Sequence, residues 1–472
     1  MQNTLTGSTG SDLRRMRRLP TGVAVAGLTV SLIVGVTVET STLWGFAPIV
    51  LYGLLAALGM PILRATAVAV VSGLLILLPG ARTALDMATE AATDQVTVIG
   101  IVILLGGALA EILRATGAAA AIVTAAMRFV GTSNPTAVGA GIMVTCLLLV
   151  GALGTLAGAL AVAVPVLLPI AARAGLTRSA TASAIFIGGC AGFAVAPFAS
   201  GNIAIMGAAD IGYLGYLLHG GGPLAAVSLA VGMIVVPWMQ RRTRDLDDHY
   251  APDELVALPT DTGDDRRATR ATIAFAVTLA VVLVVATVTT AGIVLPIVAL
   301  PLMAVATALG AGMSPKAFVT SAFRGAAALA WLFVLFFGLA VLFTAIARIN
   351  PFSVVLGSYG TDIAHLSPFL LAMTVALIGW VGVPGASAAQ VVLVDRVFGE
   401  LAAAAGIGSG VWVVVLLFAS KADTYGPLPN VNMLGVMGLC RSAGVRNILI
   451  TGWAVLVPAV VLYTAMIYLG TR

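Results

Sequence analysis

The stretch Ala196-Pro197-Phe198-Ala199-Ser200-Gly201-Asn202 interrupts a long apolar run that extends from Ala180 to about Leu218. Proline, glycine, serine and asparagine are poor residues for a helix interior, so the pattern predicts a helix that is broken here. In lipid, a broken backbone leaves peptide groups without partners. Such a break is tolerated only where it is buried in protein or lines a wet cavity.

A second stretch repeats this pattern in the other half of the chain. Gly426-Pro427-Leu428-Pro429-Asn430-Val431-Asn432 carries the same residue types, and Asn432 follows Pro427 by five residues, as Asn202 follows Pro197. One such kink is more often structural than functional. Two kinks in the same frame favour a function, because broken helices in transporters are where substrates and coupling ions bind.

The composition indicates an all-α polytopic membrane protein. The chain is 60% hydrophobic and 9% charged, with a mean hydropathy of +1.09, whereas soluble domains carry about 25% charged residues. Several apolar runs reach the ~20 residues that cross a bilayer. The first of them, Thr21–Val38, is too long for a cleaved signal, so we expect a retained helix. The net charge of +5 follows from basic cytoplasmic loops and does not indicate nucleic acid.

Hydropathy along the chain predicts one extra helix and then two sets of elements in the same order. Each set holds two helices, an amphipathic piece with a further helix, a re-entrant hairpin, a broken helix and a last helix, and the first set has a second amphipathic piece at 118–131. The first set lies at about 44–60, 62–79, 82–94, 95–113, 118–131, 137–172, 180–218 and 222–239, and the second at about 271–290, 292–311, 313–327, 328–347, 367–399, 409–440 and 447–468.

Leg length and small residues predict the hairpins. Ala137–Val150 has 14 residues, about 21 Å as a helix, against a bilayer core of about 30 Å. Its tip is Gly151–Thr155, and the tip of the second hairpin is Gly382–Ser387. In this frame Gly151 and Gly154 align with Gly379 and Gly382.

The repeat divides the chain into four parts, and charge predicts its topology. Residues 1–40 form the cytoplasmic N-terminus and extra helix, 41–239 the first repeat, 240–270 a cytoplasmic linker and 271–472 the second repeat. With the N-terminus in the cytoplasm, nineteen of the 24 Lys and Arg residues lie inside and four outside. This is the asymmetry of a multi-pass inner (plasma) membrane protein, and it makes the repeats inverted.

This order of elements resembles the ion transporter superfamily, which includes the divalent anion/sodium symporters and the gluconate, citrate and lactate permeases. The resemblance covers about 44–468 and implies a homodimer with an elevator-like motion. In the symporters, asparagines at the hairpin tips bind sodium and the substrate carboxylate. The tips of this chain have no asparagine. Its asparagines lie in the helix breaks instead.

The tips and breaks supply the candidate site for a small anion and a coupling ion. Free amides at half-helix starts favour an anion, and free carbonyls at half-helix ends favour Na⁺. We expect a possible Na⁺ near Asn202 and Asn432. Small residues also serve plain helix packing, which is the alternative. The candidate residues are Gly151, Gly154, Thr155, Pro197, Ser200, Asn202, Gly382, Gly385, Ser387, Asn430 and Asn432.

Two charged residues, Lys421 and Asp423, fall deep in a predicted membrane segment. Ionisable residues at that depth are functional candidates. Lys421 could pair with a carboxylate substrate, and Asp423 could carry a proton or bind Na⁺. The alternative is that they neutralise each other, although residues two apart do not share a helix face.

The sequence thus predicts a secondary active transporter, a carrier of a small organic anion coupled to Na⁺ or H⁺, with no other cofactor. A Na⁺/H⁺ antiporter on the same scaffold is the alternative. A channel would need a continuous polar pore. An enzyme would need a nucleophile–base or metal set within the bilayer, and the sequence offers neither. A primary pump would need a phosphate-binding glycine loop.

Overall fold

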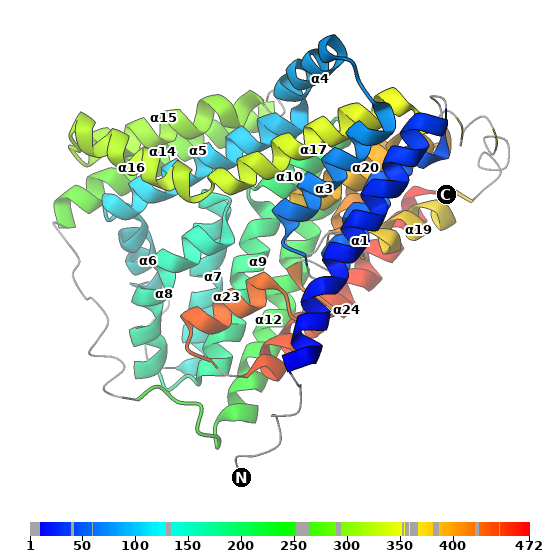
Figure 1. Cartoon of the computed structure of the whole chain (residues 1–472). Helices are drawn as coiled ribbons and strands as arrows, with labels where there is room; N and C mark the ends of the chain where they lie inside the picture. Colours follow the sequence, from blue (N-terminus) through cyan, green and yellow to red (C-terminus); the bar gives the residue numbers. More distant parts are fainter. Residues whose placement is uncertain are drawn as a thin grey trace. The chain divides into compact units, whose positions relative to one another are not determined.

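The structure is a computed structural model in which helices make up nearly all regular structure (Figure 1). It describes residues 10–38, 42–58, 60–128, 134–251, 265–288, 294–351, 354, 358, 367–380, 387–420, 424–442 and 444–472. No strand occurs within these ranges. The all-α class predicted from the composition is therefore confirmed.

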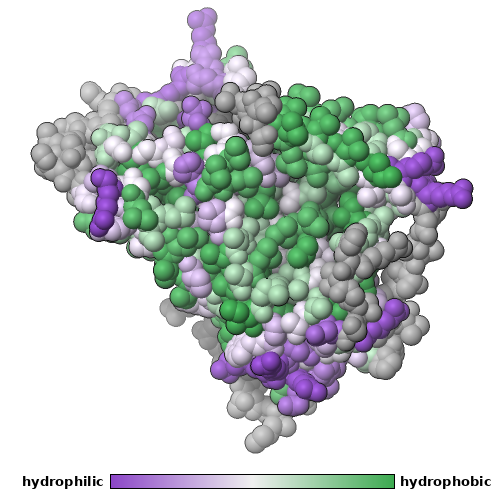
Figure 2. Space-filling model, turned by 180° about the vertical axis from the view of Figure 1, so that it is seen from behind, coloured by the Kyte–Doolittle hydropathy of each residue, from purple (hydrophilic) through white to green (hydrophobic). Residues whose placement is uncertain are grey.

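Length and hydropathy fit a chain that crosses a membrane many times. Over the described ranges, eight helical spans are long and apolar enough to do so: Leu19–Thr37, Val96–Ala115, Pro135–Leu153, Arg178–Ala208, Tyr213–Thr243, Arg266–Ala286, Ala330–Ile349 and Val445–Gly470. The face drawn in Figure 2 carries broad hydrophobic areas, and strongly hydrophilic side chains gather at its margins. Apolar surface of this extent is suited to lipid contact.

The chain forms two compact units. Unit 1 comprises Met1–Thr97, Trp331–Leu366 and Val381–Pro384. Its helices are α1 (Gly10–Thr37), η1 (Leu43–Phe46), α2 (Ala47–Ala57), α3 (Ile62–Leu77), α4 (Ala81–Thr93) and nearly all of α17 (Ala330–Ile349).

Close packing between α1 and α3 organises unit 1. A Cβ added at Gly35 would lie only 2.0 Å from the carbonyl oxygen of Leu75, so only glycine allows this approach. The hydroxyls of Ser31 and Ser72 share a buried hydrogen bond of 2.7 Å. Because polar groups inside an apolar unit need partners, this pair fixes the register of the two helices.

Unit 2 comprises Val98–Ala330, Ser367–Trp380 and Gly385–Arg472. It contains most of α5 (Gln95–Ala115), then α6 (Ala118–Arg128), α7 (Pro135–Leu153), α8 (Leu156–Arg173), α9 (Arg178–Val195), α10 (Ser200–Ala208), α11 (Tyr213–Tyr216), η2 (Leu217–Gly221), α12 (Gly222–Thr243), α14 (Asp265–Val288), α15 (Val294–Gly310), α16 (Pro315–Ala328), α19 (Pro368–Trp380), α20 (Ser387–Ala404), α21 (Ser409–Ala419), α23 (Val431–Leu439) and α24 (Val445–Gly470).

The core of unit 2 is built around α9. Helices α7, α8 and α12 all pack against α9, and α7 and α12 lie beside it in Figure 1. Nearly every residue of α9 is buried, because its small side chains let neighbouring backbones approach. A Cβ at Gly188 would lie 2.2 Å from the carbonyl oxygen of Met143, and one at Gly192 would lie 2.4 Å from that of Leu147.

Contacts between the two halves of the chain are reciprocal within unit 2. Helix α10 packs against α20, and α23 packs against α8. Likewise α7 packs on α9 as α19 packs on α21, and α9 packs on α12 as α21 packs on α24. Each of these named contacts thus has a counterpart that involves elements of the other half of the chain.

Two predicted boundaries are wrong. Helix α7 has 19 residues rather than 14, about 28 Å, so the short-leg argument for the first hairpin fails. Its counterpart α19 is short, with 13 residues. The first broken helix ends at Ala208 rather than Leu218, because 213–216 and a π-helical turn at 217–221 run on into α12.

The predicted linker 240–270 is structured at its start. Helix α12 continues to Thr243, and the chain that follows folds back onto α9. The carbonyl oxygen and carboxylate of Asp248 accept hydrogen bonds of 2.7 and 3.0 Å from the amides of Arg178 and Ser179. Tyr250 donates to the carbonyl oxygen of Cys440, and burial raises the pKa of its phenol. The described part of this loop therefore connects the N-terminal end of α9 with the C-terminal end of α23.

Candidate functional site

The first helix break occurs where the sequence predicted it. Helix α9 ends at Val195, and α10 begins at Ser200. Ala196 has φ −68° and ψ 122°, the extended conformation that a following proline imposes. Pro197 itself has no N–H to continue the helix. Pro197 thus ends α9 inside the protein, where the last carbonyl oxygens of the helix need other hydrogen-bond donors.

Asn202 supplies partners for two of these carbonyls. Its side-chain nitrogen donates hydrogen bonds of 2.8 Å to the carbonyl oxygens of both Phe193 and Ala196. The side chain is 3% exposed. The sequence predicted that Asn202 binds substrate or ion. The structure adds a second role, because the side-chain amide of Asn202 closes the end of α9.

Two tyrosines complete the end of α9. The hydroxyl of Tyr213 donates to the carbonyl oxygen of Val195 at 2.5 Å, and that of Tyr216 donates to Ala194 at 2.7 Å. The sequence analysis expected these carbonyls to be open to a cation. In this conformation each of them already accepts a hydrogen bond. The tyrosines were missed because they lie beyond the break, in a part predicted as the same helix.

The second break has a longer gap, between Ala419 at the end of α21 and Val431 at the start of α23. Buried Gln390 of α20 donates to the carbonyl oxygen of Ala419 at 2.9 Å, and also to that of Gly379. The indole of Trp380 donates to Phe418 at 2.9 Å. As at the first break, side chains from other elements close the half-helix end.

Asn430 is the N-cap of α23, at the far side of the second break. Its nitrogen donates to the carbonyl oxygen of Thr424 at 3.1 Å, and its oxygen accepts from the amide of Met433 at 2.9 Å. Asn202 likewise reaches back six residues, to Ala196. The sequence paired Asn202 with Asn432. Asn430 thus shares with Asn202 a hydrogen bond to a carbonyl six residues earlier, and the pairing of Asn202 with Asn432 stays a prediction.

The α7–α8 junction lies against the first break. Gly154 has φ +68°, and a Cβ added there would lie 2.8 Å from the carbonyl carbon of Phe198 and 3.0 Å from the amide nitrogen of Ala199. Glycine is therefore required for this contact. The next hydroxyl, that of Thr155, is buried and has no hydrogen-bond partner over the described residues.

Gly151 and Gly379 have equivalent surroundings in the two halves. A Cβ at Gly151 would lie 3.7 Å from the carbonyl oxygen of Gly192, near the end of α9. A Cβ at Gly379 would lie 2.4 Å from the Cβ of Ala419, the last residue of α21. Each glycine therefore brings a neighbouring helix against the half-helix that ends at a break.

A small cavity joins the two breaks. It has a volume of about 10 Å³, about the space of one water molecule or small ion. Its polar walls are Asn202 from the first break and Ser420 and Thr424 from the second. The remaining walls are Cys190, Phe193, Ala194, Gly201, Ile205 and Leu417. The two stretches singled out in the sequence thus meet in space, while Asn432 is not part of the lining.

Several candidate residues lie outside the described residues. These are the tip glycines Gly382 and Gly385 and the charged pair Lys421 and Asp423. Ser387 is the first residue of α20, and its side chain is not described. Their predicted roles stay predictions.

Asp395 is a carboxylate on α20 that the sequence pattern did not single out. Its Oδ1 accepts a hydrogen bond of 2.9 Å from the indole of Trp412 on α21. Helices α10, α19 and α21, which pack against α20, contribute no titratable side chain. On α20 itself the charged residues nearby are Arg396 and Glu400, both exposed. Its helix was predicted only as a hairpin leg, so nothing in the local pattern marked it.

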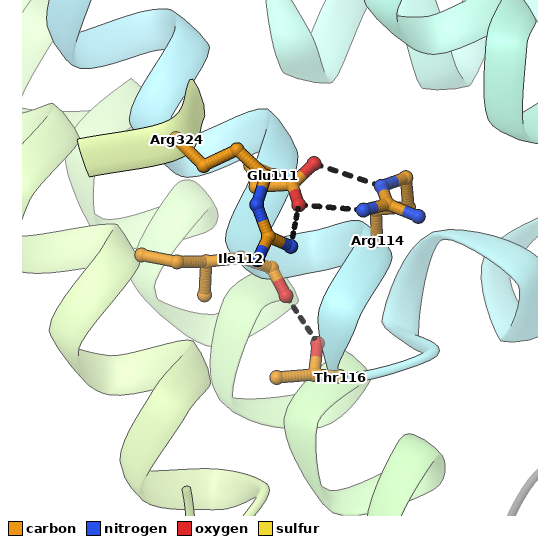
Figure 3. Close-up of polar contacts among 5 residues, drawn as sticks. All are labelled: Glu111, Ile112, Arg114, Thr116 and Arg324. Atoms are coloured by element: carbon orange, nitrogen blue, oxygen red, sulfur yellow. Dashed lines mark hydrogen bonds and ion pairs between the residues drawn. The ribbon is translucent and has the colours of Figure 1, made fainter. Parts of the chain in front are cut away.

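Glu111 forms an ion-pair cluster at the end of α5 (Figure 3). Its carboxylate accepts from Arg114 at 2.5 and 2.8 Å and from Arg324 of α16 at 3.3 Å. Arg324 lies far along the chain from Glu111 and Arg114, so sequence spacing does not predict its place in the cluster. Beside the cluster, α5 and α16 touch at Gly107 and Gly325. We interpret the cluster as a structural tie between the halves.

Together, the helical spans, the two closed breaks and the cavity between them define a polytopic membrane protein with discontinuous helices in unit 2. A solved structure has this fold: the crystal structure of the Alcanivorax borkumensis YdaH transporter, described as having an unusual topology. The TM-score is 0.56 at 16% sequence identity, over 96% of this chain and 98% of that chain. No model of a known protein family matches the sequence, and no curated protein does.

This likeness shows that the chain has the fold of a known membrane transporter. It does not show membership of the ion transporter superfamily, so the resemblance drawn from the order of elements stays a prediction. The fold covers nearly the whole of both chains, which agrees with a single helical architecture from α1 to α24.

Proposed function

We propose that this chain is a secondary active transporter that couples Na⁺ or H⁺ to the movement of a small organic anion, a carboxylate. The observation that carries the proposal is the meeting of both helix breaks at one cavity with polar walls in unit 2. Helix breaks used only for packing do not require a shared polar cavity. Breaks in transporters converge on the substrate and ion sites.

The helix starts at the first break support an anionic substrate. Helices α8 and α10 begin close together, because Gly154 touches Phe198 and Ala199. Neither N-cap residue, Thr155 or Ala199, caps its helix with a side-chain hydrogen bond. Amides at two helix starts carry partial positive charge. The free hydroxyl of Thr155 adds a donor beside them.

The cavity between the breaks supports a small cation. Ser420 donates its hydroxyl proton to the carbonyl of Leu417, and Thr424 directs its own towards the carbonyl of Ser420. The amide protons of Asn202 are likewise spent on α9. The lone pairs on the side-chain oxygens of Asn202, Ser420 and Thr424 remain as acceptors, and such oxygens suit Na⁺. The sequence prediction of Na⁺ near Asn202 and Asn432 is therefore supported for Asn202.

Inverted repeats are part of the proposal, as the basis of alternating access between 41–239 and 271–472. The reciprocal helix contacts support them. So do two ion pairs of opposite polarity. Arg348 of α17 pairs with Glu90 of α4 at 2.6 Å, and Glu111 of α5 pairs with Arg324 of α16 at 3.3 Å. Each tie links the amphipathic helix of one repeat to the long helix of the other.

Three further parts of the proposal rest on the sequence resemblance and on the charge bias: an elevator-like motion, a homodimer, and a plasma-membrane location with a cytoplasmic N-terminus. The transport reading also disfavours an enzyme. The transporter of like fold supports this in general terms.

A Na⁺/H⁺ antiporter on the same scaffold is the second candidate, and two observations favour it. The cavity of about 10 Å³ is too small for an organic anion in this conformation. Asp395 is a titratable group on a helix of the core, bonded to the neutral indole of Trp412. An antiporter needs only such a carboxylate and an ion shell.

Transport by purified protein in liposomes tests both candidates. A panel of radiolabelled mono- and dicarboxylates is offered under imposed Na⁺ or proton gradients, with internal pH read by an entrapped dye. Accumulation of one carboxylate that depends on a gradient supports the carrier. A pH change driven by Na⁺ without any carboxylate supports the antiporter. Neither signal, from protein that remains folded in the liposomes, would overturn both.

A further inference from the structure

Unit 1 contains a cleft of about 920 Å³ between the first half of α1 and the turn that joins α2 to α3. Its walls are almost entirely apolar: Val25 and Leu28 from α1, and Ala67 and Val68 from α3. One charged side chain, that of Arg64, completes the lining. The volume lies in the range of ligand sites, about 300–1,000 Å³.

Arg64 differs from Arg348, an arginine on α17 of the same unit. Arg348 is paired with Glu90. The Arg64 side chain is exposed and makes no hydrogen bond or ion pair with the described residues. It also lies in the first turn of α3, where the helix macrodipole disfavours a cation. An anion beside Arg64 would remove this unfavourable interaction.

The sequence adds positive charge at the same end of α1. Arg14, Arg15, Arg17 and Arg18 come directly before Pro20 and Thr21, which line the cleft. The cleft therefore combines apolar walls with one cation that has no partner among the described residues, and its lining begins directly after four more arginines in the chain. Basic clusters next to a membrane helix, and basic pockets between such helices, bind anionic lipid headgroups.

We propose that this cleft binds one anionic phospholipid, with the phosphodiester on Arg64 and an acyl chain between α1 and α3. A free anion such as phosphate would leave the apolar walls exposed. A zwitterionic lipid would bring its own cation to a rim that already carries positive charge. The proposal does not depend on what the protein transports.

Native mass spectrometry of the full chain in detergent tests the assignment. The protein is mixed with equal amounts of phosphatidylglycerol and phosphatidylcholine of the same acyl chains, and the adducts are counted. We expect the wild type to retain phosphatidylglycerol about fivefold better, the effect of one cation near a membrane surface. Arg64→Gln should abolish that preference, while Arg82→Gln, at an exposed arginine of α4, should keep it.

A cleft-filling variant tests the acyl chain separately. Ala67 is exposed and lines the cleft, so Ala67→Trp fills it without disturbing packed residues. We expect this variant to lose the retained lipid while it elutes as a folded protein. Equal retention of both lipids by the wild type, or equal loss in the two arginine variants, would overturn the proposal. So would a change of oligomeric mass in Ala67→Trp with lipid retention unchanged, because a second copy would then be the occupant.

Discussion

The side-chain amide of Asn202 donates a hydrogen bond of 2.8 Å to the carbonyl oxygen of Phe193, nine residues earlier and across a gap in the helix. The break between α9 and α10 is therefore closed by a side chain of α10, and no ligand is needed to close it. A variant of Asn202 can therefore lose transport in two ways. It loses the hydrogen bonds that close the end of α9, and it loses a side chain that could bind substrate or ion. The predictions below separate the two.

The first prediction concerns Asn202 itself. Asn202→Ala leaves the buried carbonyls of Phe193 and Ala196 without this donor, which should cost about 1–3 kcal/mol of folding free energy. We expect a lower midpoint of thermal unfolding in detergent, together with impaired transport. Asn134→Ser, which exchanges one helix-capping side chain for another at the start of α7, serves as the control. An unchanged midpoint in Asn202→Ala would remove the structural role.

The second prediction concerns Asp395. Asp395→Asn keeps an oxygen to accept from Trp412 but cannot release a proton. If protons are coupled at this residue, transport driven by a pH gradient should fall to the background of empty liposomes, while the fold persists. Glu400→Gln, on the exposed side of the same helix, should leave the pH dependence unchanged. A normal proton-driven rate in Asp395→Asn would exclude Asp395 as the coupling group.

The third prediction concerns topology. The three native cysteines are buried, so single added cysteines should report alone. A cysteine at Asp247, exposed after α12, should react with an impermeant thiol reagent only from the cytoplasm. A cysteine at Asp86, exposed on α4, should react only from outside. Labelling of both positions from one side would contradict the inverted repeats.

Local pattern predicted the broken helices and the amphipathic helix α4 well, because proline, glycine and charge act over a few residues. The same local pattern predicted the end of α7 at Val150, whereas the helix continues to Leu153. Gly151 is a poor helix residue, yet it lies inside α7, against Gly192 of α9. The packing of α7 along α9 outweighs a propensity cost of about 1 kcal/mol, and a packing partner cannot be read from nearby residues.

The donors that close the breaks were the hardest part to predict. Gln390 lies 29 residues before the carbonyl of Ala419 that it serves, and Tyr216 lies 22 residues after Ala194. Such partners depend on how the helices pack. The positions of the breaks were thus predictable, and their chemistry was not.

The last prediction uses two threonines that differ mainly in place. The hydroxyls of Thr155 and Thr145 are both buried without a partner over the described residues. Thr155 lies at the start of α8 beside the break, and Thr145 lies within α7. An unpaired buried hydroxyl lowers stability, so Thr155→Val and Thr145→Val should each unfold at the wild-type temperature or above it.

Transport should separate the two variants. If the Thr155 hydroxyl donates to the substrate, its loss should cost about 1–3 kcal/mol of binding, roughly a 5- to 150-fold rise in half-saturation. Thr145→Val should leave half-saturation unchanged. Liposome uptake at matched protein amounts measures both. A gain in stability in both variants with unchanged half-saturation would mean that the unpaired hydroxyl of Thr155 is a packing defect, and the anion would have to bind elsewhere than at the starts of α8 and α10.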